Sequence, residues 1–198
     1  MPDSSLPERI KYQLEQDLRQ TPPAFIRYRD LPFAIFRYDP DDEWRLRGEI
    51  RRLRTRLGQA GKRVTLISFA DLLWRAINQT EGIEAIAQFE KEQGFLSAQQ
   101  QVNTYLSRAE WAPLADTLAG MLQPLNPQHD VVFLWRAAAM GPDIFPMSTL
   151  LEMLYEHRLE VPSVLFYPGA AEQNGMGLRF LDLPDRDASQ NYRVKIYY

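Results

Sequence analysis

The sequence contains no cysteine among its 198 residues. Disulfide bonds, thiolate metal sites and thiol-dependent hydrolases are therefore excluded, and the composition fits a reducing compartment. The first residues, Met1 to Ser5, do not form a basic segment followed by an apolar one. No apolar run approaches the length of about 18 residues that a membrane span needs. We therefore expect a soluble cytoplasmic protein that does not cross a membrane.

Residues that commonly carry chemistry are also scarce. The two histidines, His129 and His157, are far apart in the sequence, and no Gly-x-Ser-x-Gly motif is present. The segment from Gly58 to Lys62 resembles a phosphate-binding loop, but that motif needs glycine at the position of Arg56 and joins a strand to a helix. The sequence thus predicts no catalytic residues, no metal site and no cofactor, and we expect a protein that is not an enzyme.

The length and the apolar content predict one globular domain. Hydrophobic residues make up 45% of the chain and aromatic residues 12%, which is enough for a sizeable core. Residues 1–30 contain a polar helix and a proline-rich connector, whereas residues 70–123 show helical periodicity throughout. We therefore predict a single α/β domain over residues 1–198 that includes both segments, the second as an all-helical insertion.

Strands and helices alternate over the rest of the chain. Four short apolar runs have the composition of buried strands: residues 33–38, 64–69, 131–135 and 164–167. Amphipathic helices are predicted at about 42–60 and 146–157. This order favours right-handed parallel connections, and hence an α/β three-layer sandwich with a mainly parallel sheet. The last two strands, 178–181 and 192–197, are expected to pair as an antiparallel C-terminal β-hairpin because a short polar loop joins them.

Polar side chains follow the predicted strands at the ends where ligands bind in open parallel sheets. They are Asp39, Asp41, Asp42 and Glu43 after the first strand, Ser68 and Asp71 after the second, Arg136 after the third and Tyr167 in the fourth. Acids with an arginine could hold a metal ion or a phosphate, which would make the chain a nucleotide- or metal-dependent enzyme. The alternative, which we favour, is that these residues cap helices and form local ion pairs.

One predicted helix is strongly basic although the chain is acidic overall. The net charge is −3, yet residues 44–63 contain eight basic residues and one acid and carry +7, so that the remaining residues carry −10. On the helix the arginines fall on two sides of the apolar stripe. One side has Arg45, Arg52 and Arg56, and the other has Arg47, Arg51 and Arg54.

Three roles are open for this helix. The simplest is a solvated surface; the others are a docking site for an acidic protein partner and a contact to nucleic-acid phosphates. Trp44 is the one aromatic residue interleaved with the arginines, which weakens the nucleic-acid interpretation. Among binding functions we favour an acidic protein partner, and we predict Arg47, Arg51 and Arg54 as partner-binding residues.

The last third of the chain carries a resemblance to a known family. Its blocks are Arg136 through to Phe145-Pro146, Ser148-x-Leu-Leu-Glu152, Val161-Pro-x-Val-Leu-Phe-Tyr-Pro-Gly169, Arg179-x-Leu-Asp182 and Asn191-Tyr192. Phe36-x-Tyr-Asp-Pro40 and the arginine-rich helix after it add to them. In this order the blocks resemble BrxB, the B component of BREX, the bacteriophage-exclusion systems of bacteria. The likeness covers most of residues 30–198.

The resemblance implies a small accessory subunit of a multi-component phage-defence system. Such systems also contain a DNA methyltransferase, a large ATPase and PglZ, a protein of the alkaline-phosphatase superfamily. The B component is not known as an enzyme and is expected to act as a scaffold that binds other BREX components. PglZ is our first choice of partner, with the methyltransferase or the ATPase as alternatives, and direct binding of nucleic acid is left open.

Overall fold

The structure is a computed structural model, and it describes residues 5–29, 31–141, 143–171, 177–181, 183, 192 and 194–198. The chain forms two compact units. The first unit is made of residues 1–66, 125–135 and 160–198, and the second of residues 67–124 and 136–159. The expectation of one domain over 1–198 stays a prediction.

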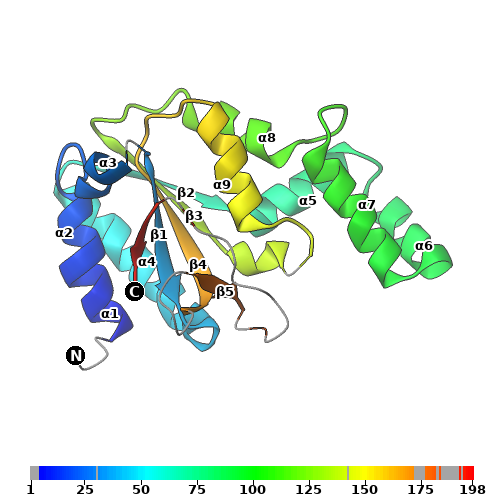
Figure 1. The fold of residues 1–198 in the computed structure, drawn as a ribbon, viewed down its shortest axis with the longest axis horizontal. Helices are drawn as coiled ribbons and strands as arrows, with labels where there is room; N and C mark the ends of the chain where they lie inside the picture. The colour runs from blue at the N-terminus through cyan, green and yellow to red at the C-terminus, as the bar shows by residue number, and fades with distance from the viewer. Residues whose placement is uncertain are drawn as a thin grey trace. The chain divides into compact units, whose positions relative to one another are not determined.

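A sheet of six described strands organises the fold (Figure 1). The strands are β1 (Phe33–Tyr38), β2 (Arg63–Ser68), β3 (Asp130–Trp135), β4 (Ser163–Ala171), β5 (Leu178–Phe180) and β6 (Lys195–Tyr197). Their order is β2-β3-β4-β1-β6, and β5 is attached to β4. β4 is parallel to β1 and β3, and β1 is parallel to β6. The predicted α/β class with a mainly parallel sheet is thereby confirmed.

The pairing predicted for the last two strands is wrong. Within the described part of the chain β5 and β6 do not form a hairpin: β5 is antiparallel to β4, with Gly169 opposite Phe180, and β6 is parallel to β1, with Ile35 opposite Ile196. The physical reason is burial of an aromatic side chain. Tyr197 of β6 is buried on the apolar face of the sheet beside Phe36, with ring centroids 6.4 Å apart, and pairing with β1 places it there.

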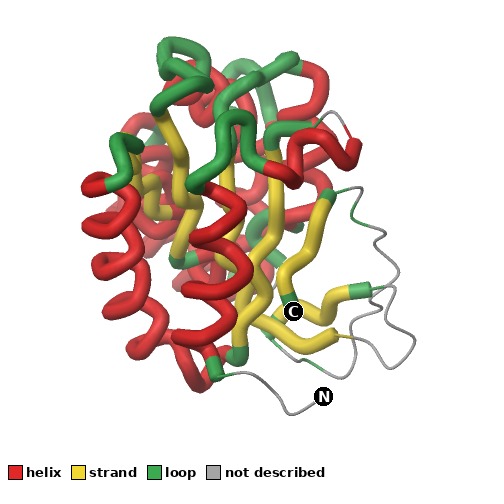
Figure 2. Tube along the Cα trace, turned by 90° about the vertical axis from the view of Figure 1, so that its left-hand side faces the viewer, coloured by secondary structure: helices red, strands yellow, loops and turns green. Residues whose placement is uncertain are grey.

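Two helical segments lie side by side on one face of this sheet (Figures 1 and 2). One runs without a break through α1 (Leu6–Arg9), η1 (Ile10–Leu14) and α2 (Glu15–Leu18), and the other is α4 (Glu43–Gln59). A short helix, α3 (Ala24–Arg29), connects α2 to β1. The polar helix predicted near the N-terminus is confirmed, whereas α3 lies in what the sequence suggested was only a connector.

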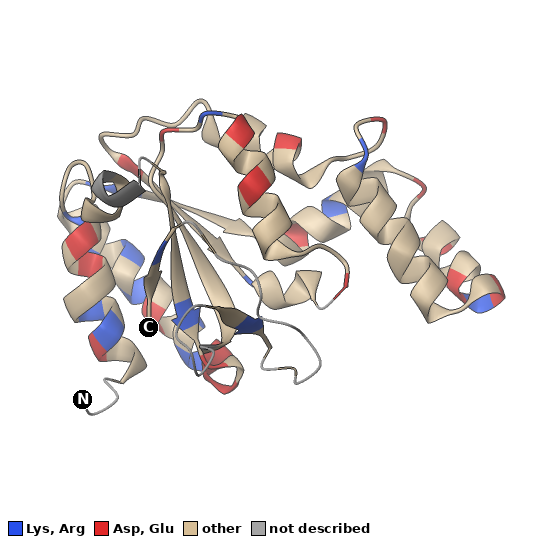
Figure 3. Cartoon of the chain, viewed as in Figure 1, with Lys and Arg blue, Asp and Glu red and all other residues tan. Residues whose placement is uncertain are grey.

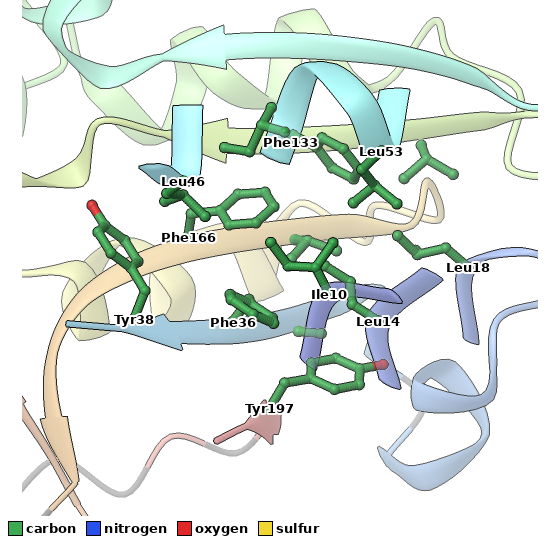
Figure 4. Packing of buried hydrophobic residues seen from close by; sticks show 14 of the residues in the cluster. Ile10, Leu14, Leu18, Phe36, Tyr38, Leu46, Leu53, Phe133, Phe166 and Tyr197 are labelled. Carbon is green, nitrogen blue, oxygen red and sulfur yellow. The ribbon is translucent and has the colours of Figure 1, made fainter. Parts of the chain in front are cut away.

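The core of the first unit fills the space between these helices and the sheet (Figure 4). Fully buried side chains come from both helical segments and from alternate strand positions: Ile10, Leu14, Leu18, Leu46, Ile50, Leu53, Leu57, Phe36, Phe133 and Phe166. The Phe133 and Phe166 rings meet edge to face at 5.3 Å. Each such side chain stabilises the fold by roughly 1.5–3 kcal/mol. Strand residues of the other parity, such as Ile35, Val132 and Leu165, are buried too, as expected of the middle layer of a sandwich.

Two buried carboxylates on α2 connect the N-terminal helices to distant elements. Glu15 Oε2 accepts from Arg56 Nε of α4 at 2.6 Å, and its other oxygen binds Arg19 at 2.8 Å. Asp17 accepts from Lys195 Nζ at 2.7 Å and from the Tyr197 hydroxyl, both on β6. Burial, together with the bond to Asp17, raises the pKa of Tyr197 well above its usual range, so the phenol stays a donor.

Apart from the last two residues of β2, the regular elements described in the second unit are helices. Its helices are α5 (Phe69–Gln79), α6 (Ile83–Gln93), α7 (Phe95–Ser107), α8 (Leu114–Leu122), η3 (Ala137–Met140) and α9 (Met147–Glu156). α5 through α8 lie between β2 and β3, which confirms the predicted all-helical insertion. Among the described residues no helix is long and apolar enough to cross a membrane.

The Tyr-Pro-Gly block, Tyr167 to Gly169, lies within β4 where the pairing with β5 begins. The Tyr167 ring packs against Phe180 at 5.2 Å, and the Pro168 carbonyl accepts from Leu181 N at 3.0 Å. Gly169 has no room for a side chain, because a Cβ atom there would lie 2.0 Å from the Arg179 carbonyl oxygen. The motif that is most distinctive in the sequence is therefore explained by a close approach of two backbones.

We predict that Gly169→Ala lowers the free energy of unfolding by about 2 kcal/mol or more, because β5 must move away from β4 to admit the methyl group. The matched control is Gly48→Ala, in the middle of α4, where nothing lies within 4 Å of the added Cβ. That change should raise the free energy of unfolding by about 0.5–1 kcal/mol. Urea denaturation of the two variants measures both values, and equal effects would contradict this account of Gly169.

Candidate functional site

The start of α4 is set by the residues that end β1. The Asp39 carboxylate accepts a hydrogen bond from Asp41 N at 3.0 Å, and Pro40 opens a short 3₁₀ turn, η2 (Pro40–Asp42), directly before the helix. Glu43 is the first residue of α4, where a negative charge is favoured by the helix dipole. The sequence Asp-Pro thus stops the strand and begins the helix within three residues.

The rotation of α4 about its axis is fixed by its buried stripe and by one of its two basic sides. The stripe consists of Leu46, Ile50, Leu53 and Leu57. On one side of it, Arg56 binds the buried Glu15, and Arg52 Nη1 binds the buried Glu49 at 2.5 Å. The arginines on this side are therefore engaged within the chain, and Arg45 also lies 3.9 Å from Asp42.

The other side carries the residues predicted to bind a partner, and we call Trp44, Arg47, Arg51 and Arg54 the Trp–Arg flank. They follow one another at spacings of three and four residues, so they form a line along the helix. Arg47 is the anchored member. Its Nε lies 2.8 Å from Glu43 Oε1, and its guanidinium carbon lies 4.3 Å from the centre of the Trp44 ring and 5.9 Å from that of Trp135.

A buried tyrosine supports this arrangement from the sheet. Tyr38, the last residue of β1, donates its hydroxyl to the Glu43 carboxylate that also binds Arg47. Burial, and then the hydrogen bond and charge of Glu43, raise the pKa of Tyr38 well above its usual range. The phenol therefore remains a donor at physiological pH, and the chain Tyr38–Glu43–Arg47 holds the Trp44 ring against a fixed cation.

The remaining members of the Trp–Arg flank face solvent. Trp44 is 78% exposed, the highest value among the exposed large hydrophobic side chains in the described part of the chain. Arg51 and Arg54 are exposed, and neither forms an ion pair with another described residue. The flank thus presents an indole surface beside two uncompensated guanidinium groups. Tryptophan and arginine are the residue types that most often dominate the binding energy of protein interfaces.

The polar residues at the strand ends have structural contacts in each unit. Besides Asp39, which caps η2, Ser68 Oγ accepts from Asp71 N at 3.3 Å and caps α5. Arg136 lies 3.5 Å from the Asp71 carboxylate. The hydroxyl of the buried Tyr167 faces the Leu178 carbonyl at 3.4 Å. Among the described residues no group of three or more His, Cys, Asp or Glu side chains is placed to hold a metal ion.

The sequence placed the arginines on one side of the helix but did not predict the contacts that hold Arg47. Trp135 belongs to β3, almost ninety residues beyond Arg47, and no periodicity connects the two. One signal was available: Tyr38 and Trp135 both end strands, and the carboxyl ends of parallel strands lie at one edge of a sheet. The helix that follows β1 starts at that same edge, so Glu43 meets Tyr38 and Arg47, one turn later, meets Trp135.

Comparison with known proteins gives one result. A family model described as "BREX protein BrxB" matches residues 65–196, about two thirds of the chain. No curated protein and no solved structure matches. The matching residues include β3, β4, β5 and the whole second unit, whereas α4 and its Trp–Arg flank precede them.

We predict that the two basic sides of α4 differ in their effect on stability. Arg56→Ala should lower the free energy of unfolding by about 1–2 kcal/mol, because it leaves the buried Glu15 with only the half-exposed Arg19. Arg51→Ala/Arg54→Ala should change it by less than about 0.5 kcal/mol. Chemical denaturation tests both values, and a large loss in the double variant would mean that these arginines serve the fold.

Proposed function

Since the chain belongs to the BrxB family, and is thereby a component of a BREX phage-defence system, we propose that it acts there as a non-catalytic accessory subunit. In this role it is a scaffold in the cytoplasm that binds other BREX components. PglZ is the first choice of partner, and the methyltransferase or the ATPase of the system is the alternative. The Trp–Arg flank of α4 is the proposed docking surface.

The observation that carries this proposal is the asymmetry of α4. One basic side is used within the chain, since Arg52 and Arg56 bind buried glutamates. On the other side Arg51 and Arg54 are exposed and Trp44 is held in place by Arg47. A solvated helix face does not need a preorganised tryptophan, whereas a docking surface gains affinity when its anchor residue is already ordered.

The chemistry of the flank indicates the kind of surface that the partner presents. Two guanidinium groups select carboxylates, which they bind through charge-assisted hydrogen bonds. The indole face of Trp44 needs an apolar or aromatic group close to those carboxylates. We therefore propose that the BREX partner contributes an acidic patch with an apolar centre, and that desolvation on docking strengthens the arginine contacts.

Two other functions remain as alternatives. Arg51 and Arg54 together with the stacking surface of Trp44 also suit a nucleic-acid strand, whose phosphates and bases need these two residue types. A nucleotide- or metal-dependent enzyme would use the strand-end acids instead, such as Asp39 and Asp71. Asp39 and Asp71 both have structural contacts, which favours the accessory role.

We predict that Arg51→Glu/Arg54→Glu weakens binding to the BREX partner by at least about 30-fold, which corresponds to about 2 kcal/mol. The measurement is co-purification with each BREX component in turn, followed by titration of the component that binds. Arg47 is left in place because its contacts to Glu43 and Trp44 position the flank.

The matched control is Arg75→Glu/Arg108→Glu, which changes the net charge by the same amount at exposed positions of the second unit. It should bind like the wild type. If both variants keep the partner at physiological salt, the flank is only a solvated surface. If the wild type binds no component but shifts duplex DNA with a steep dependence on salt, the nucleic-acid alternative replaces the proposal.

We also predict no turnover of nucleoside triphosphates, phosphodiesters or nucleic acids by the purified chain with Mg²⁺ or Mn²⁺. The reason is that the polar strand-end residues cap helices and pair locally. Measurable turnover that disappears in Asp39→Ala or Asp71→Ala would overturn the non-catalytic role. Circular dichroism of both variants distinguishes a lost active site from a lost fold.

A further inference from the structure

The second unit contains a helical hairpin with an apolar end. α6 and α7 pack against each other, and the turn between them is formed by Gly94, whose φ of 85° suits glycine. The opposite end of the hairpin is held by α7: the Tyr105 hydroxyl donates to Glu81, and Leu106 contacts the same small cavity as Leu72 of α5. The Gly94 turn is therefore about 15 Å from that attachment, given the rise of a helix over ten residues.

Two large apolar side chains stand exposed at this turn. Phe95 and Leu96, the first residues of α7, are 64% and 69% exposed. Single exposed apolar residues are common, but two adjacent ones at the free end of a hairpin form a compact projection. We call Glu90, Glu92, Phe95 and Leu96 the hairpin tip. Ile86 is the one buried residue of α6, so this helix contributes little to the core of the unit.

The sequence around the hairpin tip is acidic. Residues 81–96 contain four glutamates and one lysine and carry a net charge of −3. Figure 3 shows acidic residues along this hairpin. Glu90 and Glu92 are exposed, and within the described part of the chain neither forms an ion pair. The tip thus combines an apolar centre with two uncompensated carboxylates.

This composition is the complement of the Trp–Arg flank, which combines an exposed indole with two uncompensated guanidinium groups. We propose that the hairpin tip of one copy of this chain docks on the Trp–Arg flank of a second copy, with Phe95 and Leu96 against Trp44 and the glutamates against Arg51 and Arg54. The two surfaces differ, so the contact is head-to-tail, and each added copy leaves one tip and one flank available. Its small area makes the association weak, with a Kd on the order of 10 µM to 1 mM.

The experiment contains only the purified chain, so its result is independent of whether a BREX component binds the same flank. Sedimentation velocity at low salt, up to a concentration of about 1 mM, should show that the average mass of the wild type rises with concentration. Added salt should reverse the rise, because the charged contacts are screened. Phe95→Ser/Leu96→Ser should remain monomeric, and its circular dichroism should be unchanged because both side chains are exposed.

A charge swap gives the sharpest test. Glu90→Lys/Glu92→Lys and Arg51→Glu/Arg54→Glu should each be monomeric alone, whereas an equimolar mixture should associate, since each reversed surface then meets its complement on the other variant. The control Glu152→Lys/Glu156→Lys, at exposed positions of α9, should associate like the wild type. A monomeric wild type over the whole range, or a mixture that stays monomeric, would overturn the proposal.

Discussion

The first unit depends on two carboxylates that are buried on a single helical turn. Glu15 and Asp17 are each about 5% exposed, and a buried charge without a partner is strongly destabilising, by about 3–5 kcal/mol. Arg19 binds Glu15 and the Ala24 amide donates to Asp17 locally, but the remaining partners of both carboxylates come from other elements. Glu15 needs Arg56 of α4, and Asp17 needs Lys195 and Tyr197 of β6. The position of α2 therefore determines which side of α4 faces inward and where the last strand joins the sheet.

The surface chemistry of α4 follows from this constraint. Because Arg56 is drawn toward Glu15, the opposite side of the helix, with Trp44, Arg51 and Arg54, is turned to solvent. The same rotation places Arg47 at the strand ends, where Glu43 and the Trp135 ring are within reach. A helix that is basic on both sides thus has one side engaged in ion pairs within the chain and one side exposed to solvent. The number of arginines does not reveal this difference between the two sides, because each side has three.

The sequence was sufficient for features that depend on local periodicity. The apolar stripe from Leu46 to Leu57, the strand at 33–38 and the outer bounds of the helical segment between β2 and β3 were predicted within one or two residues. Features that depend on contacts between distant segments could not be predicted from the sequence. The partner of β6 is chosen by the space that Tyr197 fills beside Phe36, and the stack of Arg47 on Trp135 joins residues far apart in the chain. The Tyr-Pro-Gly block was recognised as distinctive, but its cause, the approach of the Arg179 backbone, needs the structure.

The separation of Asp17 from its partners has a consequence for synthesis on the ribosome. Lys195 and Tyr197 follow Asp17 by 178 and 180 residues, so the carboxylate emerges long before the side chains that bind it. The second unit has all of its residues by position 159, whereas the first is interrupted twice and closes only with β6. Vectorial translation therefore favours a helical unit that is assembled first, while the N-terminal helices wait for β6. The sheet is therefore completed only after β6 has emerged, and the charge of the buried Asp17 is the last to be compensated.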